Sequence, residues 1–216
     1  MVFDYGYGGE LLADQIEEQM PIIQVLRVID WRHAKEYESN SHQARRCAKN
    51  VLRPYIGRVD LIIIANHFVS VTSLKYFQRK YKNQKFIGLR LAQLDSKTER
   101  DIIILTTKAM YKTINYHNYI FRLKRKTKTL ILDSWTAKID EGELNNDDIK
   151  MAFAKIPPIS PDGKSTELVL ACAHFSDLKP LFKKHFGRNI KIHDSFDDAI
   201  RQACKALRLR GGTGKK

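Results

Sequence analysis

Eight short apolar runs recur along the chain, and most of the stretches between them have the periodicity of amphipathic helices. The runs are as long as β-strands and are rich in Ile, Leu and Val. They lie in MVFDY, QVLRVID, VDLIIIAN, KFIGLRL, DIIILTT, KTLILDS, ELVLACA and NIKIHDS. Helices are expected at Glu10–Gln19, Ser41–Val51, Val71–Tyr81, Lys108–Leu123, Asp147–Ala154, Asp177–Phe186 and Asp197–Leu207. Strands that alternate with helices predict an α/β protein with mainly parallel sheets.

Short polar or glycine-rich turns follow five of the apolar runs: DYGYGG, ANHF, LTTK, CAHF and HDS. In parallel α/β sheets, ligands bind outside the carboxyl ends of the strands. The turns therefore predict one binding site, and CAHF brings a thiol, Cys172, within two residues of an imidazole, His174. A structural interpretation of Cys172 stays open, because free cysteine is among the most buried residue types.

Composition favours a globular protein of the cytoplasm. Hydrophobic residues make up 43% and charged residues 29% of the chain, which is ordinary for globular domains. No apolar run approaches the ~20 residues of a membrane helix, and the N-terminus does not have the pattern of a secretory signal. Three scattered cysteines, Cys47, Cys172 and Cys204, are expected to be reduced thiols.

The formal net charge of +14 is the unusual bulk property. Cations gather in KYFQRKYKNQK (Lys75–Lys85), FRLKRKTK (Phe121–Lys128) and RLRGGTGKK (Arg208–Lys216). Such clusters bind phosphate backbones in many proteins, so nucleic acid is one candidate partner. The alternative is a basic surface that keeps the protein soluble. The sequence has no recognisable nucleic-acid-binding module. Binding to a membrane is not expected.

The order of these motifs resembles the aspartate/glutamate racemase family, especially the glutamate racemases. The family begins with a strand that runs into Asp-Ser-Gly-x-Gly-Gly-Leu, where this chain has VFDYGYGGEL. Its Cys-Asn-Thr loop is similar to LIIIANHF, and its Cys-Thr-His-Tyr loop is similar to LVLACAHF. A Thr-rich turn resembles IIILTTKAMYKTINY, and an Ile-Asp-Ser turn resembles KIHDSFDDAIRQA. The similarity extends over nearly the whole chain.

The resemblance implies two similar three-layer α/β domains with an active-site cleft between them. Applied to this sequence, one domain would comprise residues 1–97 plus 195–216, and the other residues 98–194. The cleft would take a small carboxylate or an amino acid, and a homodimer is possible because the family often forms dimers. No cofactor is implied, and the sequence has no metal-spaced Cys/His cluster and no dinucleotide fingerprint.

The family's chemistry is racemisation at the α-carbon by two thiols on opposite faces of the substrate. Two acid/base groups are required because one removes the α-proton and the other returns a proton to the opposite face. By resemblance, Cys172 is one of these groups, His174 supports it, and Asp4 organises the site. The position of the other thiol is occupied by Ala65, whose methyl group cannot transfer a proton.

Further family positions carry other residues in this chain. The resemblance implies substrate contacts at Tyr5, Asn66, His67, Thr107 and Ala173. Tyr5 replaces a serine, while His67 and Ala173 replace threonines. Three functions stay open: an active racemase, a decarboxylase-type enzyme that uses Cys172 alone, and a catalytically silent relative that binds a ligand, protein or nucleic acid.

Overall fold

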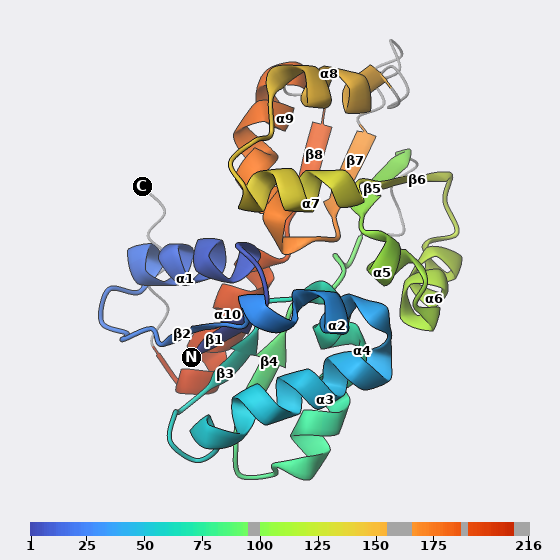
Figure 1. Cartoon of the computed structure of the whole chain (residues 1–216). Coiled ribbons are helices and arrows are strands. Elements are labelled where there is room, and N and C mark those ends of the chain that lie inside the picture. Colours follow the sequence, from blue (N-terminus) through green and yellow to red (C-terminus); the bar gives the residue numbers. More distant parts are fainter. Residues whose placement is uncertain (95–99, 155–165, 187–189, 210–216) are drawn as a thin grey trace. The chain divides into compact units, whose positions relative to one another are not determined.

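A computed structural model describes residues 1–94, 100–154, 166–186 and 190–209 (Figure 1). The chain divides into two compact units, which comprise residues 1–90 with 195–216 and residues 91–194. The boundary expected at residues 97 and 98, the segment 155–165 and most of the basic C-terminal tail lie outside the described residues. No described helix is both long enough and apolar enough to cross a membrane.

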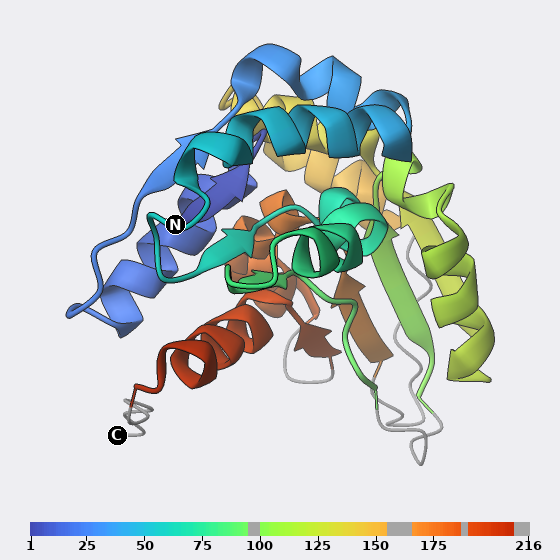
Figure 2. The same cartoon turned by 90° about the horizontal axis from the view of Figure 1, so that it is seen from below.

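Unit 1 contains a four-stranded parallel sheet in the order β2-β1-β3-β4. Its strands are β1 (Val2–Asp4), β2 (Arg27–Ile29), β3 (Ile62–Ile64) and β4 (Phe86–Gly88). Its helices are α1 (Gly8–Gln19), η1 (Trp31–His33), α2 (Ala34–Ser39), α3 (Ser41–Leu52), η2 (Arg53–Tyr55), α4 (His67–Lys80) and α10 (Phe196–Leu207). The last helix, α10, returns from the far end of the chain and packs beside β4 (Figure 2).

Unit 2 repeats this plan with a parallel sheet in the order β6-β5-β7-β8. Its strands are β5 (Ile102–Thr106), β6 (Thr127–Ile131), β7 (Thr166–Leu170) and β8 (Ile190–His193). Its helices are α5 (Lys108–Tyr111), α6 (Ile114–Leu123), α7 (Asp133–Asp140), α8 (Asn146–Ala154), η3 (Ala173–Leu178) and α9 (Lys179–Phe186). The α/β class with parallel sheets, expected from the apolar runs, is confirmed.

In unit 1, α2 was not expected and α4 begins four residues earlier than expected. In unit 2, three helical expectations need correction. The helix expected over Lys108–Leu123 is two helices, because the Thr113 side chain accepts a hydrogen bond from the Tyr116 amide and starts a new one. The helix expected at Asp177 is preceded by the 3-10 helix η3, which follows directly after Cys172. The helix α7 was not expected: its first two residues were assigned to the end of a strand, and no element was predicted for the rest.

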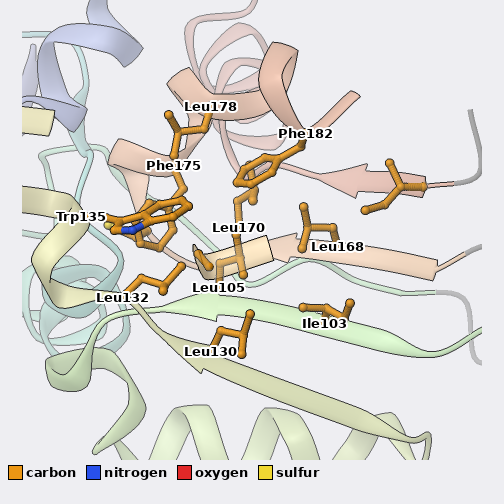
Figure 3. Close-up of a cluster of buried hydrophobic side chains, with 13 residues drawn as sticks. Ile103, Leu105, Leu130, Leu132, Trp135, Leu168, Leu170, Phe175, Leu178 and Phe182 are labelled. Atoms are coloured by element: carbon orange, nitrogen blue, oxygen red, sulfur yellow. The ribbon is translucent and has the colours of Figure 1, made fainter. Parts of the chain in front are cut away.

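The core of unit 2 lies on one face of its sheet (Figure 3). Side chains alternate between the two faces of a strand, so Leu168, Leu170 and Cys172 point to the same side. Trp135 from α7 and Phe175 from η3 meet there edge to face, with ring centroids 6.2 Å apart. Each large side chain buried in this way contributes about 1.5–3 kcal/mol. This core therefore fixes α7 against the carboxyl end of β7.

Gly9 in α1 permits a close approach between that helix and the sheet of unit 1. A Cβ atom at Gly9 would lie 2.5 Å from Asp4 Cβ and 2.7 Å from Ile29 Cδ1. Both distances are far shorter than van der Waals contact, so the position requires glycine.

We expect Gly9→Ala to lower the free energy of unfolding by about 1–3 kcal/mol, because overpacking outweighs the better helix propensity of alanine. Urea unfolding measures the change. Glu18→Ala, on the exposed side of the same helix, is the control and should change stability by less than about 0.5 kcal/mol. An unchanged stability in Gly9→Ala would contradict the close packing.

Candidate active site

The topology of each sheet indicates where a ligand site belongs. In each unit the strand order reverses between two central strands, β1 and β3 in unit 1, and β5 and β7 in unit 2. Ligands of open α/β sheets bind at the carboxyl ends of the strands at such switch points. The turns after these four strands contain the predicted site residues, so the fold positions them where binding chemistry is expected.

In unit 1, Asp4 and Asn66 join the ends of the two central strands. The Asp4 carboxylate is fully buried, and its Oδ1 accepts hydrogen bonds from the Tyr5 amide at 2.7 Å and from Asn66 Nδ2 at 3.1 Å. Asn66 also caps α4, because its Oδ1 accepts a hydrogen bond from the Val69 amide at 3.0 Å. The Asn66 side chain therefore links the end of β1 to the start of α4.

The other predicted residues of unit 1 are largely buried. The Tyr5 ring stacks on Tyr37, with centroids 4.6 Å apart and planes at 9°. The Tyr37 hydroxyl donates to Asp30 Oδ2 at 2.9 Å. Burial raises the pKa of this hydroxyl, and the Asp30 carboxylate raises it further. Ala65 is fully buried and His67, the first residue of α4, is 3% exposed. Tyr5 is thus held by an aromatic contact, and the turn after β3 presents little polar side-chain surface.

In unit 2, three side chains form a hydrogen-bonded chain that ends on a thiol. Cys172 Sγ lies 3.5 Å from His174 Nδ1, and His174 Nε2 lies 2.9 Å from Asp140 Oδ1. Cys172 and His174 are buried, while the Asp140 side chain is 28% exposed. With a carboxylate on Nε2, the imidazole is held in one orientation with Nδ1 toward the sulfur.

The electrostatics of this group favour a protonated imidazole. Burial lowers the pKa of His174, but its interactions with Cys172 and with the Asp140 carboxylate together raise it well above the usual 6.5. A cation beside a thiol stabilises the thiolate, which is the form that acts as base or nucleophile. The arrangement can therefore hold and move a proton at Cys172 Sγ.

Asp140 was missed by the sequence analysis. It is the last residue of α7, and it lies 34 positions before His174 in the chain. The only sequence signal was weak: the apolar residues Trp135 and Ile139 are four positions apart after an acidic residue, Asp133, in a possible first turn. Recognising α7 would have brought Asp140 into consideration.

The remaining predicted residues have more modest contacts. Thr107 caps α5, since its Oγ1 accepts a hydrogen bond from the Met110 amide at 3.3 Å. Ala173 is buried and offers only a methyl group. Ser176, within η3, donates its hydroxyl hydrogen to Asp194 Oδ1 at 2.9 Å. Ser195 stands at the N-cap position of α10 but makes no capping hydrogen bond with its side chain.

Metal-binding side chains do not gather in the part of the chain that the structure describes. Among those residues, no group of three or more His, Cys, Asp or Glu side chains is placed to hold a metal ion.

Comparison with known proteins finds similarity to glutamate racemases. The glutamate racemase of Lactococcus lactis subsp. cremoris (strain MG1363) is 23% identical over 214 residues, which cover 95% of this chain and 78% of that protein. The enzyme of Aliarcobacter butzleri (strain RM4018) is 24% identical over 219 residues, covering 95% of this chain and 82% of the relative. No family model matches the sequence.

Solved structures give the same result for the fold. Escherichia coli glutamate racemase, in complex with L-glutamate and the activator UDP-MurNAc-ala, has a TM-score of 0.81 at 19% identity, covering 100% of this chain and 85% of that one. The Campylobacter jejuni enzyme has a TM-score of 0.77 at 20% identity, covering 100% and 88%. The chain therefore has the glutamate racemase fold.

We expect the imidazole of His174 to titrate above 6.5, and Asp140→Asn and Cys172→Ser each to lower its pKa. Each substitution removes one of the two groups whose interaction with the imidazole raises the pKa of His174. NMR of the histidine side chains across a pH series measures the midpoints.

The control for this titration is Asp147→Asn, which removes an exposed carboxylate that pairs with Lys150. It should leave the His174 midpoint unchanged. A His174 midpoint at or below 6.5 in the unsubstituted protein would contradict the charged arrangement.

Proposed function

We propose that this chain, a distant homologue of the glutamate racemases, transfers a proton at the α-carbon of an amino acid without a cofactor, using Cys172 as the acid/base group. The observation that carries the proposal is the Cys172–His174–Asp140 chain. A thiol that serves only to fill a core has no need of an imidazole and a carboxylate aligned behind it.

The proposed step begins with the thiolate of Cys172. Its sulfur takes the α-proton, the C–H electron pair moves onto the substrate carboxyl group, and Cys172 becomes a thiol. The reverse step returns a proton from sulfur to carbon. His174, held by Asp140, carries the positive charge that favours the thiolate and exchanges protons with the sulfur.

The substrate class we propose is an acidic amino acid. Support comes from relatives whose solved structures hold L-glutamate, in the E. coli enzyme, and D-glutamate, in the Francisella tularensis enzyme. Amide groups at the start of α4 are suited to hold a carboxylate, because helix N-termini favour anions. The roles of Asp4, Tyr5, Asn66 and His67 toward the substrate stay predictions from the resemblance.

Ala65 determines the stereochemical outcome of the proposed reaction. In the family resemblance this position belongs to the thiol that serves the opposite face of the α-carbon. With a methyl group there, a proton removed by Cys172 returns to the face that it left. We therefore infer that the chain exchanges the α-proton with solvent and retains the configuration of the substrate.

A second candidate is a catalytically silent protein that binds a small carboxylate, and the specific observation in its favour is again Ala65. The methyl group of Ala173 and the bulky Tyr5 at two further substrate positions support it as well. Binding without exchange distinguishes this candidate from the proposed enzyme.

The first test is α-proton exchange in D₂O, followed by proton NMR over single enantiomers of aspartate, glutamate and other amino acids. We expect loss of the α-proton signal for at least one enantiomer, with no change in optical rotation. Cys172→Ala should reduce the exchange rate by about 100-fold or more, because it removes the acid/base group. Cys47→Ala is the matched control and should leave the rate unchanged.

Absence of exchange with every substrate would overturn the enzymatic proposal. Calorimetric titration of the same amino acids would then test the silent candidate.

Ala65→Cys should turn exchange into racemisation. A thiol at this position would supply a base for the opposite face, so the product would lose optical rotation while it gains deuterium. Polarimetry and NMR on the same sample separate the two processes. The double variant Ala65→Cys, Cys172→Ala is the control, and it should not racemise. Inversion by the unsubstituted protein would show that another group already serves the second face.

A further inference from the structure

One long segment of the chain carries a large excess of positive charge. Residues 40–90 contain eleven lysines and arginines but one acidic residue, Asp60, which gives a formal charge of +10. The whole chain has +14, so all its other residues together contribute +4. This concentration is a property of unit 1 and is separate from the Cys172 group in unit 2.

The structure places much of this charge on two neighbouring helices, α3 and α4, which pack against each other (Figure 1). Arg46, Lys49 and Arg53 recur at helical spacing along α3 and its end, and Lys75 and Arg79 recur along α4; all five are exposed or half-exposed. Seven residues of helix span about 10 Å, and packed helices lie about 8–10 Å apart. We call the surface formed by these five cations the α3–α4 face.

Tyrosines lie between the cations at the contact of the two helices. The Arg45 guanidinium lies 5.1 Å from the Tyr76 ring centroid and donates to the Thr72 carbonyl oxygen at 2.9 Å. Lys80 Nζ donates to the Tyr76 hydroxyl at 3.1 Å and lies 5.8 Å from the Tyr81 ring centroid. These partners are neutral, so they orient the cations without cancelling their charge.

Some cations elsewhere in the chain have acidic partners. Arg27, for example, forms salt bridges with Glu10, Asp14 and Glu17. By contrast, none of the salt bridges found among the described residues includes a lysine or arginine of residues 40–90. The positive charge of the α3–α4 face is therefore available to an external anion.

The character of this face favours phosphates over a lipid surface. The large apolar side chains that are exposed in the described residues lie outside residues 40–90, so this segment offers none for insertion into a membrane. Two rows of cations separated by roughly 10 Å are comparable in spacing to the ~12 Å major groove of a duplex. We propose that the α3–α4 face binds the phosphate backbone of duplex nucleic acid without sequence preference.

The test is fluorescence anisotropy of a labelled DNA duplex of about 20 base pairs, titrated with the protein over a series of salt concentrations. We expect binding at low salt, with a slope of log K against log salt near −3 or steeper, because each phosphate contact contributes about −0.9. The triple variant Arg46→Glu, Lys49→Glu, Arg53→Glu should weaken binding at least 10-fold and make the slope shallower.

A matched control separates the face from the net charge. Lys112→Glu, Lys183→Glu and Lys184→Glu replace three exposed cations of unit 2 outside the basic clusters of the sequence, so both triple variants change the formal charge from +14 to +8. The control should bind nearly as well as the unsubstituted protein. Thermal unfolding checks that each variant is folded, and the corresponding glutamine variants give a milder form of the same comparison.

Three results would overturn the proposal. The first is no binding at low salt. The second is an equal loss in the two triple variants, which would assign binding to net charge alone. The third is equal affinity for vesicles of phosphatidylserine at the same salt concentration, which would assign the face to anionic surfaces in general.

Discussion

The edge-to-face contact between Trp135 and Phe175 is the interaction on which the arrangement of the candidate active site depends. Trp135 belongs to α7 and Phe175 to η3, so their packing in the core of unit 2 holds these two helices together. Asp140 ends α7, and His174 lies next to Phe175. An apolar contact thus sets the distance between an aspartate and a histidine that the hydrogen bond alone would not fix, because both side chains rotate freely in an unpacked segment.

The sequence was a good guide to the strands and an uneven guide to the helices. Each of the eight apolar runs contains a strand. The central strands β1, β3, β5 and β7 are buried along their whole length, as expected for parallel strands covered on both faces. Helix α7 was not predicted, because Trp135 and Ile139 are too few apolar residues to give a clear helical periodicity. The division at Thr113 was also hidden, since the apolar pattern continues across it and a side-chain cap causes the break.

The site residues that could be predicted from the sequence are those brought together by local structure or by neighbouring strands. Cys172 and His174 are two residues apart, so the turn between β7 and η3 brings them together by local geometry alone. Asp4 and Asn66 are 62 residues apart, yet Asp4 ends β1 and Asn66 follows β3, and these adjacent parallel strands end at the same edge of a sheet. Asp140 reaches His174 only through tertiary packing, which periodicity does not encode.

The two units differ in how their charged side chains are paired and solvated. In unit 2 the Glu167 carboxylate is fully buried, and Arg125 Nη1 lies 2.7 Å from it, since a buried carboxylate without a cation would be costly. In unit 1 the cations of the α3–α4 face are solvated, so leaving them without acidic partners costs little for each one. Together, however, they repel one another and weaken the folded state. Folding does not require this repulsion, and a polyanion on that face would relieve it. The excess charge is therefore better explained by binding than by stability.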